Sequence, residues 1–191
     1  MISTREKIVR AAQRLLAQSG LSGAGLNQVI AASGAPRGSI YYHFPEGKAQ
    51  WVAEALNAYG EHFCNLAGEM LSRKGDFGEN LEALLLNLAD GMEKSKCAYG
   101  CPIGAVILDL DQSSENLREV CARTVLQWQA IFQLHLSALG VKRSQDLASF
   151  ILSAIEGALM LSRMESSARP LRSAAAILRR QVKSELADRS A

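Results

Sequence analysis

The chain has 191 residues, of which 48% are hydrophobic and 21% charged, so its composition excludes a disordered chain and suits one globular unit or two small ones. No apolar run reaches the roughly 18 residues of a membrane span, and the N-terminus, MISTREKIVR, lacks the apolar segment of a secretory signal. We therefore expect a cytoplasmic protein without a membrane partner, whose four cysteines are reduced.

The net charge of +2 is distributed unevenly along the chain. Residues 1–48 contain six Lys/Arg and two Asp/Glu, a balance of +4, and residues 49–162 contain eight and fourteen, a balance of −6. Residues 163–191 contain seven and three, again +4. A basic N-terminal segment joined to an acidic one indicates that the first 48 residues bind a polyanion.

Three short helices are predicted in the basic segment. The first begins at the S-x-x-E capping box of Ser3 and Glu6 and ends at Gly20. The second is LNQVIAAS, residues 26–33, with Asn27 as its candidate N-cap and Gly34 as its end. The third has Pro36 at its first position and ends by Phe44. Two short helices joined by a glycine turn and braced by a first helix are typical of a helix-turn-helix.

Longer amphipathic helices follow, and no convincing strand alternation is found. The candidate segments are residues 48–73, 78–95, 102–110, 114–139, 144–167 and 170–188, separated by the breaks KGDFG, KCAYGCP, DQSS, GVKRS and SSARP. The sequence therefore predicts an all-α protein. A three-helix DNA-binding head forms domain 1–48, and a body of about six helices forms domain 49–191.

The stretch GAPRGSIYYHF, residues 34–44, combines polar and aromatic residues in a way that suits contact with DNA. In a helix-turn-helix, the N-terminal end of the second helix enters the major groove. Gly38 would let the helix backbone approach DNA closely, and Arg37 could reach a guanine edge or a phosphate. Tyr41, Tyr42 and His43 carry hydrogen-bonding groups on rigid rings, which suits the sugar-phosphate walls of the groove.

The sequence LNQVIAASGAPRGSIYYHF, followed by Lys48, resembles the DNA-binding signature of the TetR/AcrR transcriptional regulators. This resemblance implies an all-helical homodimer with an N-terminal helix-turn-helix and a C-terminal ligand domain. It implies that Ile40 and Phe44 hold the head together. The positions that it assigns to DNA contacts are Asn27, Pro36, Arg37, Gly38, Ser39, Tyr41, Tyr42, His43 and Lys48.

Two features depart from the commonest pattern of that family. Three residues separate Phe44 from Lys48, where two are usual, and Leu26-Asn27 stands where a Thr or Ser cap is usual. With these features and with GCPIGAVILDL, residues 100–110, the chain resembles the subgroup that contains lincomycin-resistance repressors.

The body offers candidates for an effector pocket and for a dimer surface. The pocket candidates are Phe63, Met92, Cys101, Ile103, Ile107, Trp128 and Phe132. The dimer candidates are Phe150, Ala154, Ala158, Leu161, Leu171, Leu178 and Val182, which the family resemblance places in a four-helix bundle between two chains. Helical spacing alone is equally consistent with intrachain core for the dimer candidates, and for the pocket candidates it favours core over ligand contact.

We therefore expect a ligand-responsive DNA-binding regulator that is a homodimer. The favoured form is a repressor that a small lipophilic or aromatic effector releases from palindromic double-stranded DNA. Two alternatives are a redox-sensing regulator that uses Cys97 and Cys101, and a helical protein-interaction module without specific DNA binding. No catalytic motif is found, and the cysteine spacing matches no common zinc site, so neither enzyme activity nor a metal or cofactor is expected.

Overall fold

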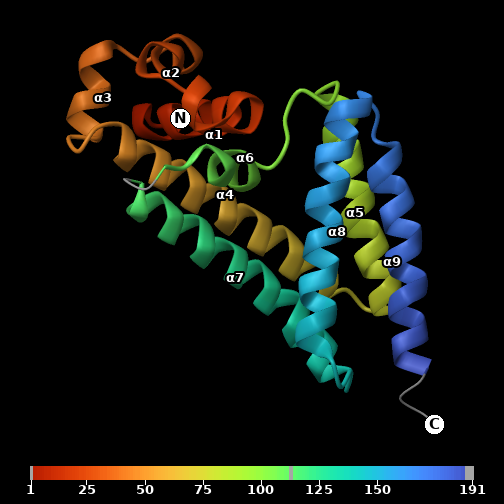
Figure 1. Ribbon diagram of the computed structural model, residues 1–191. Coiled ribbons are helices and arrows are strands. Elements are labelled where there is room, and N and C mark those ends of the chain that lie inside the picture. Colours follow the sequence, from red (N-terminus) through yellow and green to blue (C-terminus); the bar gives the residue numbers. More distant parts are fainter. Residues whose placement is uncertain (1, 112–113, 188–191) are drawn as a thin grey trace. The chain divides into compact units, whose positions relative to one another are not determined.

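The computed structural model describes residues 2–111 and 114–187, and it contains no strand within these ranges. The helices of the described residues are α1 (Thr4–Gly23), α2 (Leu26–Ser33), α3 (Arg37–His43), α4 (Lys48–Leu71), α5 (Phe77–Lys94), α6 (Pro102–Asp109), α7 (Glu115–Ala138), α8 (Ser144–Glu165) and α9 (Arg169–Ala187) (Figure 1). The all-α prediction is confirmed.

The six long segments predicted after residue 47 correspond to α4–α9, with ends that agree to within about two residues. Two of these helices start at simple local features: Asp76 accepts a hydrogen bond from the Glu79 amide at the start of α5, and Pro102 is the first residue of α6. The predicted end at residue 188 and two residues of the DQSS break, Gln112 and Ser113, lie outside the described residues.

Intrachain contacts divide the chain into two compact units. Unit 1 comprises residues 1–62 and 100–124, and unit 2 comprises residues 63–99 and 125–191. Unit 1 therefore contains α6 and the first parts of α4 and α7 in addition to the three helices of the predicted domain 1–48. As a functional boundary, residue 48 remains a prediction.

In unit 1, the buried face of α1 braces α2 and α3. Ser3 caps α1 by accepting a hydrogen bond from the Glu6 amide at 3.2 Å, as the capping box predicts. Ile8, Ala12 and Leu16 are fully buried on one face of the helix. The α-helical geometry is interrupted at Gly20, where the sequence places the end of the helix, and a further short stretch of α1 continues from there to Gly23.

In unit 2, α9 packs against both α5 and α8, as Figure 1 shows. Leu81, Leu84 and Leu85 of α5 and Ile151 and Ile155 of α8 are buried in this layer. Leu171, Leu178 and Val182 bury the matching stripe of α9. Within each helix these residues are one, three, four or seven positions apart, which places them on one face of the helix.

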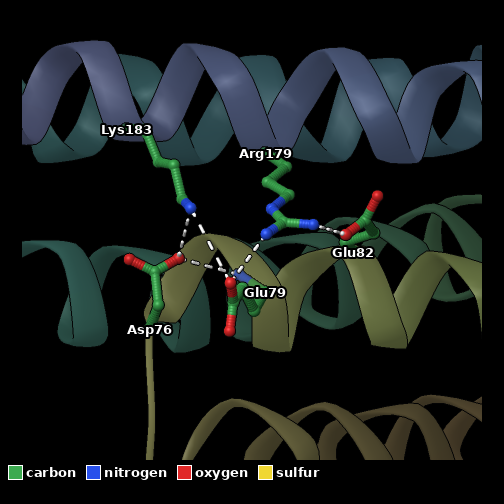
Figure 2. Close-up of polar contacts among 5 residues, drawn as sticks. All are labelled: Asp76, Glu79, Glu82, Arg179 and Lys183. Atoms are coloured by element: carbon green, nitrogen blue, oxygen red, sulfur yellow. Dashed lines mark hydrogen bonds and ion pairs between the residues drawn. The ribbon is translucent and has the colours of Figure 1, made fainter.

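The solvent-facing side of the α5–α9 contact carries ion pairs (Figure 2). The Arg179 guanidinium binds Glu82 and Glu79, each at 2.6 Å. The Lys183 ammonium lies 3.7 Å from Glu79 and 4.0 Å from Asp76. The hydrogen bond to Glu82 raises the pKa of Arg179 above its ordinary value. These side chains are between 23% and 53% exposed, so solvent screens the pairs and each stabilises the fold only modestly.

Among the described helices, α8 is the one long and apolar enough to cross a membrane by length and composition. Of its most apolar stretch, 44% is buried inside the protein, and a core helix meets the same test. Its remaining apolar residues, Phe150, Met160, Leu161 and Met164, are exposed.

Candidate nucleic-acid interface

A tight turn joins α2 to α3. Gly34 adopts the left-handed conformation (φ 65°) and donates its amide to the Ile30 carbonyl at 3.0 Å, which ends α2. The Ser33 hydroxyl accepts a hydrogen bond from the Ala35 amide at 3.2 Å. Glycine adopts this backbone conformation at the lowest cost, so its presence at residue 34 favours the turn.

The N-terminal caps of both helices differ from the sequence prediction, by two residues in α2 and by one residue in α3. Gly25 is the N-cap of α2, and Asn27 lies inside the helix with an exposed side chain; its predicted role as N-cap is wrong. Pro36 is the N-cap of α3 and not its first residue, because its ψ of 143° is extended. The proline ring fixes φ but leaves ψ free, which is why a pattern alone does not distinguish the two positions.

Helix α3 separates an inward face from an outward one. Ile40 is 1% exposed and Phe44 is fully buried, in agreement with their expected role in holding the head together. Tyr41 is 55% exposed and Tyr42 is 81% exposed. The remaining predicted DNA contacts on this helix and its cap are exposed or half-buried: Pro36, Arg37, Gly38, Ser39 and His43.

The rings at the C-terminal end of α3 contact one another. The Tyr42 and His43 ring centroids lie 5.0 Å apart at an interplanar angle of 76°, an edge-to-face arrangement. The His43 and Phe44 centroids lie 6.4 Å apart. Phe44 is buried, so this chain of rings anchors the exposed Tyr42 to the core of the head.

Gly38 faces open space. A Cβ atom built on this residue would have no neighbour within 4 Å, and its backbone does not have a positive φ. Packing and backbone geometry of the chain therefore do not require glycine at this position. A glycine that the fold does not require, in the middle of an exposed face, leaves the helix backbone accessible to a partner.

The Lys48 side chain contacts the head itself. Its ammonium donates a hydrogen bond to the Leu21 carbonyl at 2.6 Å. Partial desolvation lowers the pKa of Lys48, while the negative charge of Asp109 acts in the opposite direction. Arg37, by contrast, has no ion-pair partner in the part of the chain that the structure describes.

Four supporting side chains were missed by the sequence analysis: Arg5, Gln50, Glu54 and Asp109. The Arg5 guanidinium lies over the Phe44 ring and pairs with Glu54 of α4, and Gln50 binds the same Glu54 carboxylate at 3.4 Å. Asp109 accepts a hydrogen bond from the Ser22 amide. The contacts of Arg5 and of Asp109 join residues that are far apart in the sequence, so no local pattern indicates them, whereas Gln50 and Glu54 lie one helical turn apart.

The residues predicted to line an effector pocket occur in both units. In unit 2, Phe63 and Trp128 are buried, with ring centroids 4.8 Å apart, and Met92 and Phe132 are also buried. In unit 1, Cys101 and Ile103 are buried on α6 and its cap, whereas Ile107 is exposed. As a set of ligand contacts, these residues remain a prediction.

The residues predicted to form a dimer surface separate into two groups. Ala158, Leu171, Leu178 and Val182 are buried against other helices of the same chain, so they form intrachain core and are not available to a second copy. Phe150 and Leu161 are exposed, and Ala154 is half-buried. Three residues that the analysis omitted are also exposed: Met160, Met164 and Ile177.

The cysteines lie in different surroundings. Cys101 is the N-cap of α6, where its sulfur accepts a hydrogen bond from the Gly104 amide at 3.5 Å. Cys97 is buried, with a left-handed backbone conformation (φ 57°). Burial raises the pKa of Cys121 to about 11. Among the described residues, no group of three or more His, Cys, Asp or Glu side chains could hold a metal ion.

Comparison with known proteins agrees with this arrangement. Residues 8–55 match the family described as bacterial regulatory proteins, tetR family, and residues 78–177 match the C-terminal domain of LmrA/YxaF-like transcriptional regulators. The HTH-type transcriptional regulator LmrA of Bacillus subtilis (strain 168) is 34% identical over 170 residues, which cover 88% of this chain and 90% of the relative. The uncharacterized HTH-type regulator YxaF of the same strain is 32% identical over 170 residues, with 88% and 89% covered.

Solved structures show the same fold. A regulatory protein TetR from Rhodobacter sphaeroides superimposes with a TM-score of 0.83 at 21% identity, over 92% of this chain and 96% of that one. The helix-turn-helix with its exposed aromatic face defines a DNA-binding protein of the transcription-regulator class. The chain belongs to the TetR family of transcriptional regulators, with a C-terminal domain of the LmrA/YxaF-like type. The members of this family are regulators and not enzymes.

Proposed function

We propose that the protein is a repressor that binds a palindromic operator and is released by a small effector. The observation that carries this proposal is the outward face of α3, where Gly38 leaves open space beside the exposed Arg37, Tyr41 and Tyr42. Placed in a major groove, this face would bring the helix backbone close to the base edges and the phenolic hydroxyls to the sugar-phosphate walls. The contacts proposed for the interface are Asn27, Pro36, Arg37, Gly38, Ser39, Tyr41, Tyr42, His43 and Lys48.

The proposed binding unit is a homodimer. One helix-turn-helix contacts only a few base pairs, so a palindromic site needs two heads about 34–36 Å apart. The exposed apolar residues of α8, together with Ile177 of α9, support an interface with a second copy. This revised dimer surface consists of Phe150, Ala154, Met160, Leu161, Met164 and Ile177.

The proposed effector is lipophilic or aromatic and binds in the body of a cytoplasmic regulator. The neighbouring Phe63 and Trp128 rings and the buried Phe132 provide aromatic surface and few charges, which favours planar apolar ligands. An effector that binds better to a form with differently spaced heads would lower DNA affinity by linkage. A decisive shift requires several kcal/mol of differential binding, about 5.5 kcal/mol to invert a 99:1 population.

The test is binding-site selection from a random duplex library, followed by fluorescence anisotropy on the enriched duplex at two salt concentrations. We expect an inverted repeat bound by two chains, with affinity that falls as salt rises. Aromatic compounds would then be screened for release of the labelled duplex. Failure to enrich any sequence would contradict operator binding, and a directly repeated or single half-site would contradict the palindromic dimer.

A further inference from the structure

One peptide group in unit 1 is held from both sides by side chains of opposite charge. The carbonyl of the Leu21–Ser22 peptide accepts a hydrogen bond from the Lys48 ammonium at 2.6 Å. The amide of the same peptide donates to the Asp109 carboxylate at 3.0 Å. Lys48 is the first residue of α4, and Asp109 is the last residue of α6. Two helices that are distant in the sequence therefore meet on the last turn of α1.

The backbone break at Gly20 creates the space for this contact. Gly20 has a left-handed φ of 67° with an extended ψ of −168°, so the α-helical geometry of α1 is interrupted just before the clamped peptide. A Cβ atom on this residue would lie 2.4 Å from the Asp109 carboxylate oxygen. Both the conformation and the approach of the carboxylate thus require glycine.

A second hydrogen bond attaches the other end of α6 to α1. The Gly100 amide, just before α6, donates to the Ala17 carbonyl at 3.0 Å. The two bonds lie on either side of Gly20, and Figure 1 shows α6 beside α1. With both of its ends bonded, α6 gives the Asp109 carboxylate a fixed position relative to the last turn of α1.

The Leu21–Ser22 peptide, which Lys48 and Asp109 hold, lies in the chain between the main part of α1 and the helix-turn-helix formed by α2 and α3. Ser22 precedes the first residue of α2 by four positions, so the direction of the chain at Ser22 sets where α2 begins. Lys48 has three ammonium donors, of which the Leu21 carbonyl takes one, so two remain for a phosphate. The hydrogen bonds from Lys48 and to Asp109, called the clamp below, therefore orient α2. They also orient the Lys48 ammonium, which faces solvent.

We propose that Asp109 is a positioning residue for DNA binding, which acts by holding the Leu21–Ser22 peptide against Lys48 and so fixing the start of the helix-turn-helix and the direction of the Lys48 ammonium. This inference rests on the proposed function. Asp109 itself need not touch DNA.

Removal of the Asp109 side chain would have two effects on DNA affinity, and they act in opposite directions. One comes from the lost negative charge and the other from the lost hydrogen bond to the Ser22 amide. Removing a negative charge from a DNA-binding head should, by electrostatics alone, strengthen binding to a polyanion. Loss of the hydrogen bond to Ser22 should weaken binding. Asp109→Ala should therefore bind specific DNA about 10-fold more weakly. Asp109→Asn keeps a side-chain oxygen that can accept from the Ser22 amide, and it should stay within about 3-fold of the parent.

The matched control is Asp111→Ala, which removes the same charge two residues further along the chain. Asp111 accepts a hydrogen bond from Ser114 and takes no part in the clamp. This variant should bind DNA as tightly as the parent or slightly more tightly. The probe is the duplex enriched by the parent from the random library, and the nonspecific reference is a scrambled duplex of equal length.

A second measurement, made without DNA, reports whether the hydrogen bond between the Ser22 amide and Asp109 is formed. Hydrogen exchange at the Ser22 amide should be slow in the parent, in Asp109→Asn and in Asp111→Ala, and faster in Asp109→Ala. In a double-mutant cycle, Lys48→Ala should reduce the effect of Asp109→Ala on DNA binding, because both residues act on one peptide.

The outcomes separate this inference from the proposed function. Selection of a defined sequence by the parent, with weaker binding by Asp109→Ala and rescue by Asp109→Asn, supports the inference. Equal or tighter binding by Asp109→Ala overturns it, as does an equal loss in both Asp109 variants or unchanged exchange at Ser22. If the parent selects no sequence, the proposed function fails first and this role for Asp109 fails with it.

Discussion

The Arg5 guanidinium lies over the Phe44 ring, 5.5 Å from its centroid, and its other side chain contact is the Glu54 carboxylate, at 2.5 Å. The start of α1 is thereby joined to the C-cap of α3 and to α4. Arg5 is about half exposed, so both contacts are partly screened by solvent.

We expect Arg5→Met to lower the free energy of unfolding by no more than about 1 kcal/mol, because it removes a cation–π contact and a partly exposed ion pair but keeps an apolar stem over the ring. Urea unfolding measures this effect. Glu54→Gln removes the ion pair alone and should cost less. A larger loss in Glu54→Gln than in Arg5→Met would contradict this division.

Gly38→Ala should change stability and DNA binding in opposite directions. The fold has room for the added methyl group, and alanine favours a helix over glycine by up to about 1 kcal/mol, so the variant should be at least as stable as the parent. The same methyl group would lie on the face proposed to meet DNA, and affinity should fall by about 10-fold or more. The control is Gly91→Ala in α5, where an added Cβ also has no neighbour within 4 Å. It should gain stability without losing affinity.

Arg37→Ala should make DNA binding less sensitive to salt. If Arg37 neutralises one phosphate, the slope of log K against log salt concentration should become less steep by about 0.9. Its stability should be unchanged, since the described residues provide no ion-pair partner for its side chain. Anisotropy titrations at several salt concentrations measure the slope. Lys142→Ala, an exposed cation between α7 and α8, is the control, and an equal change in both variants would contradict the assignment.

Phe150→Glu and Leu161→Glu should dissociate the proposed dimer while each chain stays folded. Both side chains are exposed in the single chain, so a charge there has no intrachain cost of burial. Leu178→Ala is the contrasting variant: this residue is 1% exposed, and its truncation should cost about 2–5 kcal/mol of stability. Sedimentation equilibrium with thermal unfolding distinguishes the two effects. A stable dimer of Phe150→Glu and Leu161→Glu would contradict the proposed surface.

Cys121 should make the folded state less stable in alkali. Burial raises the pKa of its thiol to about 11, so the folded state binds this proton more tightly than the unfolded state does. The resulting stabilisation is fully present below the ordinary thiol pKa of 9.0 and is lost as pH rises through about 11. Urea unfolding at about pH 8 and pH 10.5 should show a smaller decline in Cys121→Ala than in the parent. Equal declines would contradict a buried, protonated thiol.

Local signals were sufficient to predict the elements of the head. The Ser3 cap, the left-handed Gly34 and the proline before α3 act through a few neighbouring residues, so a single sequence displays them. The errors at Asn27 and Pro36 amount to two residues and one residue, because several adjacent residues can satisfy the same cap.

Whether a given apolar residue of α8 or α9 is buried was less predictable. Leu178 and Phe150 both lie on amphipathic helices, yet one is core and the other is exposed. Helical spacing identifies a face and does not identify what covers it, because the covering atoms come from helices distant in the sequence.

The sequence by itself determined that the protein is all-helical and that it carries a helix-turn-helix with an aromatic, basic outer face, since helix propensity, capping and turn conformation are local properties. The tertiary structure decided which apolar residues are core and which charged side chains meet. Lys48 and Asp109 have no sequence pattern that links them, and they bind the same peptide only because α6 packs along α1. Burial and long-range hydrogen bonds depend on that packing, which no local stretch of the chain specifies.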